Sequence, residues 1–263
     1  MRHWNRYIGN ETFGGKRPEY FGPLSHLRSH MLTFLQRPWP RSPGNLFLTR
    51  DAIVFCDPVD EALLQRSGHT PCPVEDGTPR DAFWRAFIAA WRGNLFERFS
   101  PATHEVAASG TAYIQPGAVV GGSPYKVITL DGKRQLVPHA GGVLVDDDVS
   151  IGSNTCIDSG IYGELTEIRA EAMIDNLVHI GHSVTVGRRA RIVAGAAIGG
   201  WAEIGEDVWI GLGAVVRDHC KVGDGAVVGM GAVVVKDVPQ NVTVVGNPAR
   251  EVNYLRLKPE ACI

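Results

Sequence analysis

The sequence lacks several features that would assign it to common classes of protein. Its 263 residues include only five cysteines, an odd number with no CxxC pair, so reduced thiols and a cytoplasmic location are expected. No apolar run approaches the roughly 20 residues of a membrane span, and the N-terminus MRHWNRYIGN has no hydrophobic segment like that of a signal peptide. The net charge of −2 predicts no general attraction to nucleic acid or to an anionic membrane.

A six-residue period is the strongest pattern that the chain does have. From Ile168 to Val234 every sixth residue is Ile or Val, and four residues after each stands Ala, Val or Cys, from Ala172 to Val238. Helices and ordinary strands repeat their apolar residues every ~3.6 and ~2 positions, so neither explains this period. The hexapeptide repeat of a parallel β-helix does explain it, because three hexads make one triangular coil of about 18 residues. Residues 18 apart should therefore be neighbours in space.

The period also divides the chain. Residues 1–100 do not follow it, and we expect them to form a small α/β domain. Residues 101–252 should form the β-helix, so the predicted fold class is mainly β. A segment at 121–142 breaks the period and is expected to leave the coil, and such an excursion is usually a functional element or a subunit contact. Residues 253–263 remain as a C-terminal tail.

Within the first domain one helix is predicted clearly. Thr78 is a good N-cap residue, and Pro79 is favourable at the first helical position. The apolar residues that follow recur every four positions, as on one face of a helix. They are Phe83, Phe87, Trp91 and Leu95.

His182 and Gly200 are the first candidates for chemistry. His182 occupies the third position of its hexad, which faces outward, and Gly200 is 18 residues on, one coil above. A histidine can act as a general base, and a glycine lets a thioester approach its backbone N–H, which could hold the oxyanion. On the period alone, an ordinary surface histidine is the commoner interpretation.

The run IGSNTCIDSGIYGELTEIRAEAMIDNLVHIGHSVTVG resembles the UDP-3-O-acylglucosamine N-acyltransferases of lipid A synthesis. That family has matching IGxNTxID and DN(L/Q)VQIAHN stretches, and a weaker likeness in SPGNLFLT and PVEDGTPRDAFWRAF extends the match to residues 43–230. The resemblance implies a left-handed β-helix, a homotrimer with sites between subunits, and an N-terminal domain that recognises a nucleotide. The aromatic residues that might stack on a base there are Trp4, Tyr7, Phe13, Tyr20, Phe21, Trp39 and Phe47.

The same resemblance assigns roles to individual residues. It makes His182 the general base and Gly200 the oxyanion donor, and it implies that Asn176 takes part in catalysis. The second active-site histidine of the family falls on His219, which would bind substrate together with Asp175.

The C-terminal run VVVKDVPQNVTVVGNPAREV resembles a different group, the CoA-dependent sugar acetyltransferases. This end has no helices like those that dock an acyl carrier protein, which favours a short acyl group carried by CoA. Lys236 and Arg250 could meet the CoA phosphates, although both could equally be solvated surface cations. The exposed pair Leu212 and Met230 would flank the pantetheine arm.

The predicted function is transfer of an acetyl group from acetyl-CoA to the amine of a nucleotide-linked amino sugar, in cell-surface polysaccharide or lipopolysaccharide biosynthesis, without a metal. One alternative is long-chain N-acylation of a UDP-glucosamine derivative from a carrier protein. Another is a β-helix that only binds or acts as a scaffold. His179 and His182 also have the HxxH spacing of a zinc site, as in γ-class carbonic anhydrases, but no third ligand stands out.

Overall fold

The computed structural model describes residues 11–13, 15–18, 20–21, 31–35, 51–92, 106–137 and 139–252. The chain divides into two compact units. One contains residues 106–124 and 141–252, and the other contains the described residues up to 92 together with 125–140. Trp4, Tyr7, Trp39, Phe47, Leu95 and the tail 253–263 lie outside the described residues. Among the residues described, no helix is long and apolar enough to span a membrane.

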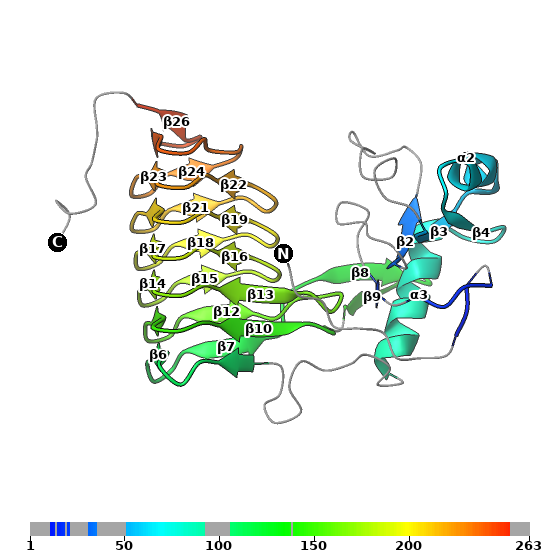
Figure 1. Ribbon diagram of the computed structural model, residues 1–263, viewed down its shortest axis with the longest axis horizontal. Coiled ribbons are helices and arrows are strands. Elements are labelled where there is room, and N and C mark those ends of the chain that lie inside the picture. The colour runs from blue at the N-terminus through cyan, green and yellow to red at the C-terminus, as the bar shows by residue number, and fades with distance from the viewer. Residues whose placement is uncertain are drawn as a thin grey trace. The chain divides into compact units, whose positions relative to one another are not determined.

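The larger unit is the parallel β-helix that the six-residue period predicts, and it is left-handed, as the family resemblance implies. Three flat sheets form its walls, and the ladders of parallel strands are visible in Figure 1. The first sheet contains β5 (Val106–Ala108), β10 (Gly142–Val145), β13 (Leu165–Ile168), β16 (Thr185–Val186), β19 (Glu203–Ile204) and β22 (Lys221–Val222). The second contains β6 (Tyr113–Ile114), β11 (Ser150–Ile151), β14 (Met173–Ile174), β17 (Arg191–Ile192), β20 (Trp209–Ile210), β23 (Val227–Val228), β25 (Thr243–Val245) and the antiparallel β26 (Arg250–Glu251).

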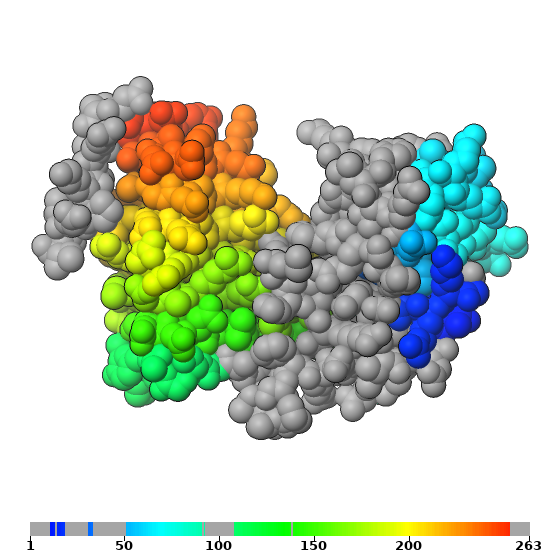
Figure 2. Space-filling model, viewed as in Figure 1, coloured from blue at the N-terminus to red at the C-terminus, as the bar shows by residue number. Residues whose placement is uncertain are grey.

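The third sheet contains β7 (Val119–Gly122), β12 (Cys156–Asp158), β15 (His179–Ile180), β18 (Ala197–Ile198), β21 (Val215–Val216) and β24 (Val233–Val234). Strands 18 residues apart are paired, for example Ile180 with Ile198. Figure 2 shows the coils as successive bands of colour from green to red, because each coil packs on the one before it.

The periodic residues form the core. Every Ile or Val of the series from Ile168 to Val234 is at most 2% exposed, and the small residues four positions later are buried as well. Burial of an aliphatic side chain contributes roughly 1.5–3 kcal/mol, so a core of this kind stabilises the coil along its whole length. The period thus predicted which residue of each hexad points inward.

Two corners of the coil matter below. We call the turns 181–184, 199–202, 217–220 and 235–238, which join the third sheet to the first, the His182 corner. The turns 175–178, 193–196, 211–214 and 229–232, which join the second sheet to the third, are the Asn176 corner. Three of the four turns at the His182 corner have a residue with positive φ, and these residues are Ser183, Trp201 and His219.

The segment that leaves the coil is shorter than the predicted excursion 121–142, and it belongs to the other unit. Val119–Gly122 and Gly142–Val145 are strands of the coil, paired with β12 and with β5 and β13. The residues between them form an antiparallel hairpin, β8 (Val127–Leu130) and β9 (Lys133–Leu136), which belongs to the other unit. A hexad count detects where the coil stops, but it carries no information about what the departing segment packs against.

In the smaller unit the strands β1 (Tyr20–Phe21), β2 (Met31–Leu35), β3 (Ile53–Cys56) and β4 (Thr70–Pro73) pair in parallel in that order. A short 3-10 helix, η2 (Pro58–Asp60), leads into α2 (Glu61–Arg66). Helix α3 (Pro79–Arg92) begins where predicted, since the Asp81 N–H donates to Thr78 Oγ1 at 3.1 Å. The four cysteines that are described, Cys56, Cys72, Cys156 and Cys220, are free thiols.

Candidate functional site

The His182 corner brings three of the predicted residues together. His182 is half-buried, and its imidazole lies where a side chain of Gly200 would be, since a Cβ on Gly200 would stand only 2.5 Å from Cε1 and 2.6 Å from Nε2. The two residues are 18 apart and occupy the same position in successive turns, as the period predicts. The absence of a side chain at Gly200 is therefore what gives the ring its place.

The backbone of Gly200 is arranged as an oxyanion donor requires. Its carbonyl accepts the N–H of His219 at 3.0 Å, which holds the peptide in place. Among the described residues no acceptor takes the Gly200 N–H, and the glycine is half-exposed. A preorganised N–H next to an imidazole is a recurring arrangement for acyl transfer.

An aromatic stack surrounds the histidine ring. Trp201 meets His182 edge to face at 4.2 Å between ring centroids, and it stacks on His219 at 4.9 Å with an interplanar angle of 11°. Tyr162 stacks on the other side of the indole at 6.1 Å. His219 is thus connected to His182 through Trp201, a residue that the sequence analysis did not single out.

Glu164 is the main residue that sequence reasoning missed. It lies in the segment 159–164 between β12 and β13, where the hexad count slips. Gly142 pairs with Leu165, 23 residues on, so this coil has five residues more than the usual 18. The extra residues do not form a surface loop, because Ile161 and Glu164 are 0% exposed and Tyr162 is 4% exposed.

The Glu164 carboxylate accepts hydrogen bonds from a serine hydroxyl, an indole N–H and a backbone N–H. Oε1 accepts the Ser183 hydroxyl at 2.6 Å and the Trp201 indole N–H at 3.2 Å, and Oε2 accepts the backbone N–H of Tyr162 at 2.7 Å. Burial, and secondarily the negative charge of Glu164, raises the pKa of Tyr162 well above its usual range, so this phenol is neutral. Ser183 Oγ also lies 3.5 Å from His182 Nδ1. The sequence did contain one signal of this site, because Tyr162 and Glu164 stand in the segment where the six-residue period is broken.

Asp175 and Asn176 lie at the Asn176 corner, at the opposite end of β15 from His182. The two Asp175 carboxylate oxygens accept the N–H groups of Asn176 and Ala194 at 2.7 and 3.1 Å, and Asn176 Oδ1 accepts the N–H of Ser153 at 2.7 Å. They therefore connect adjacent coils, which leaves the Asn176 NH₂ group as the polar end available to a ligand. Within one chain the structure does not bring them to His182.

The residues predicted to bind the acyl donor are divided between the corners. Leu212 and Met230, 57% and 79% exposed, stand above Asn176 at its corner. Lys236 stands above Gly200 at the His182 corner, two turns further on, and Arg250 lies on β26. The third sheet lies between Lys236 and the pair Leu212 and Met230, and Arg250 belongs to the second sheet.

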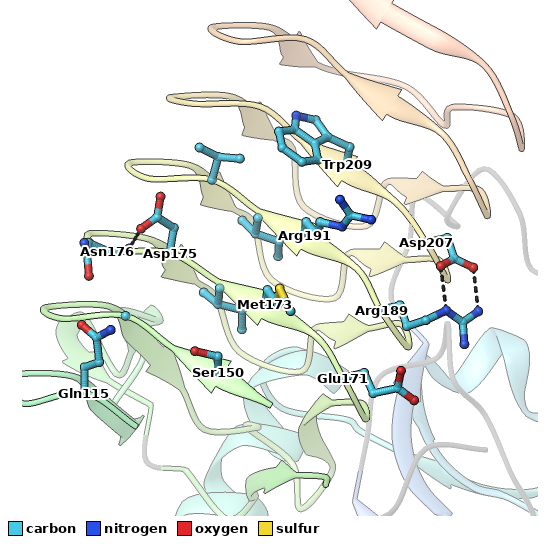
Figure 3. A pocket seen from close by; sticks show the side chains of 14 residues that line it. Gln115, Ser150, Glu171, Met173, Asp175, Asn176, Arg189, Arg191, Asp207 and Trp209 are labelled. Carbon is cyan, nitrogen blue, oxygen red and sulfur yellow. Dashed lines mark hydrogen bonds and ion pairs between the residues drawn. The ribbon is translucent and has the colours of Figure 1, made fainter. Parts of the chain in front are cut away.

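The second sheet has a hollow of about 680 Å³ on its outer face (Figure 3). Strand residues Met173, Arg191 and Trp209 line it, with Asp175 and Asn176 at one edge and the Arg189–Asp207 ion pair at the other. The Arg191 guanidinium lies 5.7 Å from the Trp209 ring centroid. His182 and Gly200 do not line this hollow, so it is distinct from the His182 corner.

The zinc alternative finds no support at His179. Its side chain is half-exposed on the third sheet, and its Nε2 lies 3.8 Å from an Asp158 carboxylate oxygen. Burial raises the pKa of Asp158, an effect that His179 opposes. Across the described ranges, no three His, Cys, Asp or Glu side chains are grouped as metal ligands.

Comparisons with known proteins agree with the repeat. Residues 202–236 match the family described as bacterial transferase hexapeptide (six repeats). The UDP-3-O-acylglucosamine N-acyltransferase of Methylacidiphilum infernorum is 49% identical over 138 residues, 52% of this chain and 39% of that protein. UDP-3-O-acylglucosamine N-acyltransferase 1 of Gloeobacter violaceus is 47% identical over 148 residues, 56% of this chain and 42% of that protein. The chain thus spans about two fifths of the length of these curated relatives.

Solved structures with a similar fold share less sequence. PerB from Caulobacter crescentus, solved with CoA and GDP-perosamine, is 21% identical at a TM-score of 0.33 and covers 75% of this chain and 77% of its own. LpxA from Acinetobacter baumannii is 16% identical at a TM-score of 0.44 and covers 57% of this chain and 72% of its own. The chain thus contains hexapeptide repeats, and about half of it is similar in sequence to UDP-3-O-acylglucosamine N-acyltransferases.

Proposed function

We propose that this protein is an acyltransferase that moves an acetyl group from acetyl-CoA to the amine of a nucleotide-linked amino sugar. The observation that carries the proposal is the His182 ring packed on Gly200, with an N–H beside it that no acceptor among the described residues takes. An imidazole and a donor at this spacing supply the base and the oxyanion contact that acyl transfer needs.

The reaction would proceed at the His182 corner. The amine nitrogen attacks the thioester carbonyl carbon while His182 Nε2 takes a proton from the nitrogen. The carbonyl oxygen, now negative, accepts the Gly200 N–H. The C–S bond then breaks, the amide is complete, and the CoA thiolate leaves and recovers the proton from the imidazolium. No redox step and no additional reactant are required.

A second candidate is transfer of a long hydroxyacyl chain from an acyl carrier protein to a UDP-glucosamine derivative. It is favoured by the names of the two relatives that are 49% and 47% identical over 138 and 148 residues. Purified protein should be assayed with acetyl-CoA and with 3-hydroxyacyl carrier protein, against a panel of UDP- and GDP-linked amino sugars. Turnover with acetyl-CoA supports the first proposal, turnover with the carrier alone replaces it, and no turnover with either favours a binding module.

We also propose that the protein works as a homotrimer with each site shared between two copies. Asn176 lies at a different corner from His182 in its own chain, so a neighbouring copy would have to supply the Asn176 that acts beside His182. The smaller unit would recognise the nucleotide. Phe13 and Phe55, in edge-to-face contact at 5.6 Å, are described aromatics of this unit.

Charge reversal near the top of the coil tests where the donor binds. If the CoA phosphates meet Lys236 and Arg250, then Lys236→Glu and Arg250→Glu should each raise the KM for acetyl-CoA and change kcat less, because uniform binding is lost. Initial rates over a range of acetyl-CoA concentrations measure this. Lys221→Glu is a matched control, since Lys221 pairs with Glu203 at 3.0 Å on the first sheet. An unchanged KM for acetyl-CoA in both variants would show that the CoA phosphates do not bind at Lys236 and Arg250.

A further inference from the structure

The buried carboxylate of Glu164 has a geometry that points beyond a structural role. We infer that Glu164, acting through Ser183, is a positioning residue that sets the tautomer of His182 and stabilises its protonated form. This inference rests on the proposed role of His182 as the base. Both Glu164 and Ser183 are shielded from solvent, since each is 0% exposed.

The direction of each hydrogen bond follows from the donors available. A serine hydroxyl has one proton, and at 2.6 Å from Glu164 Oε1 that proton is directed to the carboxylate. Ser183 Oγ therefore presents a lone pair to His182 Nδ1, 3.5 Å away. The neutral imidazole then carries its proton on Nδ1 and its lone pair on Nε2, the atom that lies against Gly200. The 3.5 Å distance between His182 Nδ1 and Ser183 Oγ should shorten when substrate binds.

The Glu164 carboxylate accepts hydrogen bonds from several donors, an arrangement that favours its charged form. Its donors include the Ser183 hydroxyl, the Trp201 indole N–H and the Tyr162 backbone N–H. Trp201 adopts a left-handed conformation, with φ of 57°, which is unfavourable for a non-glycine residue. The bond to Glu164 helps to offset that cost, and the indole in turn confines the His182 ring by edge-to-face contact. One carboxylate thus holds the ring through two neighbours.

Proton uptake by His182 would place a positive charge two hydrogen bonds from a buried negative one. A nearby opposite charge favours the charged form of a titrating group. Other titratable groups near the ring, among the residues that the structure describes, include Tyr162, which is neutral, and His219, which stacks on Trp201. Asp218 is exposed and lies 4.0 Å from His219. Glu164 is a carboxylate linked to His182 through the buried Ser183.

Glu164→Gln tests the inference because it keeps the size of the side chain and removes the charge. In either orientation the glutamine places its NH₂ group against a donor that the carboxylate accepts, the Trp201 indole N–H or the Tyr162 backbone N–H, and it leaves Ser183 and the His182 ring without an anion behind them. We expect kcat to fall by about 10²-fold. The acidic limb of the kcat/KM profile should also move to lower pH, because the imidazolium loses its negative neighbour. A merely structural role would not move this limb.

The matched control is Glu167→Gln, a change in a glutamate that is 4% exposed on β13 and pairs with Arg169 at 3.4 Å. It should leave both the rate and the pH profile close to wild type. Ser183→Ala is the second variant, for the case that Glu164→Gln does not fold, since it keeps the charge and breaks the connection. It should lower kcat as well, with a smaller shift of the acidic limb.

Titration of the His182 Hε1 resonance by NMR gives a readout that needs no turnover. The resonance is assigned by its absence in His182→Ala, and its pKa should be lower in Glu164→Gln than in wild type or Glu167→Gln. An unshifted titration and pH profile in Glu164→Gln, together with an inactive His182→Ala, would overturn the relay and leave the base intact. An active His182→Ala would overturn the base and this inference together.

Discussion

His182→Ala should fold, assemble as wild type does and lose catalysis. The ring is half-buried and lies outside the aliphatic core, so its removal takes nothing from the residues that hold the coil together. A general base contributes typically ~10²–10⁴-fold to a rate, and we expect a loss of kcat of that size at saturating amine. Steady-state kinetics at pH 7–8 measure it, with circular dichroism as the check on folding. A variant that keeps more than about a tenth of the wild-type kcat would exclude His182 as the base.

Two further variants test whether the loss of activity is specific to His182. His179→Ala removes a histidine of the same motif that is half-exposed on the third sheet, and its activity should remain close to wild type. Asn176→Asp keeps the oxygen that accepts the Ser153 N–H and removes the NH₂ group, so it should be folded but impaired. If sites are shared between copies, co-assembly of His182→Ala with Asn176→Asp restores part of the activity, because some sites contain neither change. No recovery in verified mixed oligomers would place each site within one chain.

Gly200→Ala should be nearly as damaging, although it adds only one methyl group. The new Cβ would stand 2.5 Å from His182 Cε1, closer than any real contact, so the ring must move. A displacement of about 1 Å at a reacting group can cost on the order of 10²-fold in rate. Overpacking at such a site also costs typically ~1–3 kcal/mol, which thermal or urea unfolding would record. Both effects should appear together.

The steric origin of this loss can be isolated with a second change. Gly110→Ala adds the same methyl group where nothing lies within 4 Å, and it should alter neither stability nor rate appreciably. In the His182→Ala background the obstacle is gone, so Gly200→Ala should then cost little stability. The difference between the two backgrounds is the interaction energy of a double-mutant cycle. Equal costs in both backgrounds would mean that the methyl group collides with something other than the imidazole.

The sequence predicted most in the regular part of the coil, because there each residue repeats the environment of the one 18 positions earlier. The inward aliphatic series and the place of Gly200 above His182 follow from counting alone. Asp175, Asn176, Leu212 and Met230 show where counting stops being sufficient. Their positions within the hexads are as predicted, and they lie at a different corner from His182. The period of one chain cannot show which residues of two copies would meet in a shared site.

What the sequence alone determined is the β-helix, its inward residues and the pairing of the His182 ring with a residue that has no side chain. These follow because a fixed period converts position in the chain into position in space. The tertiary structure alone decided the role of the irregular hexad at 159–164, which brings Glu164 beneath Ser183 and Trp201. It also assigned the hairpin 125–140 to the other unit. Where the period is broken, the neighbours of a residue are set by packing between distant segments, and no local pattern records them.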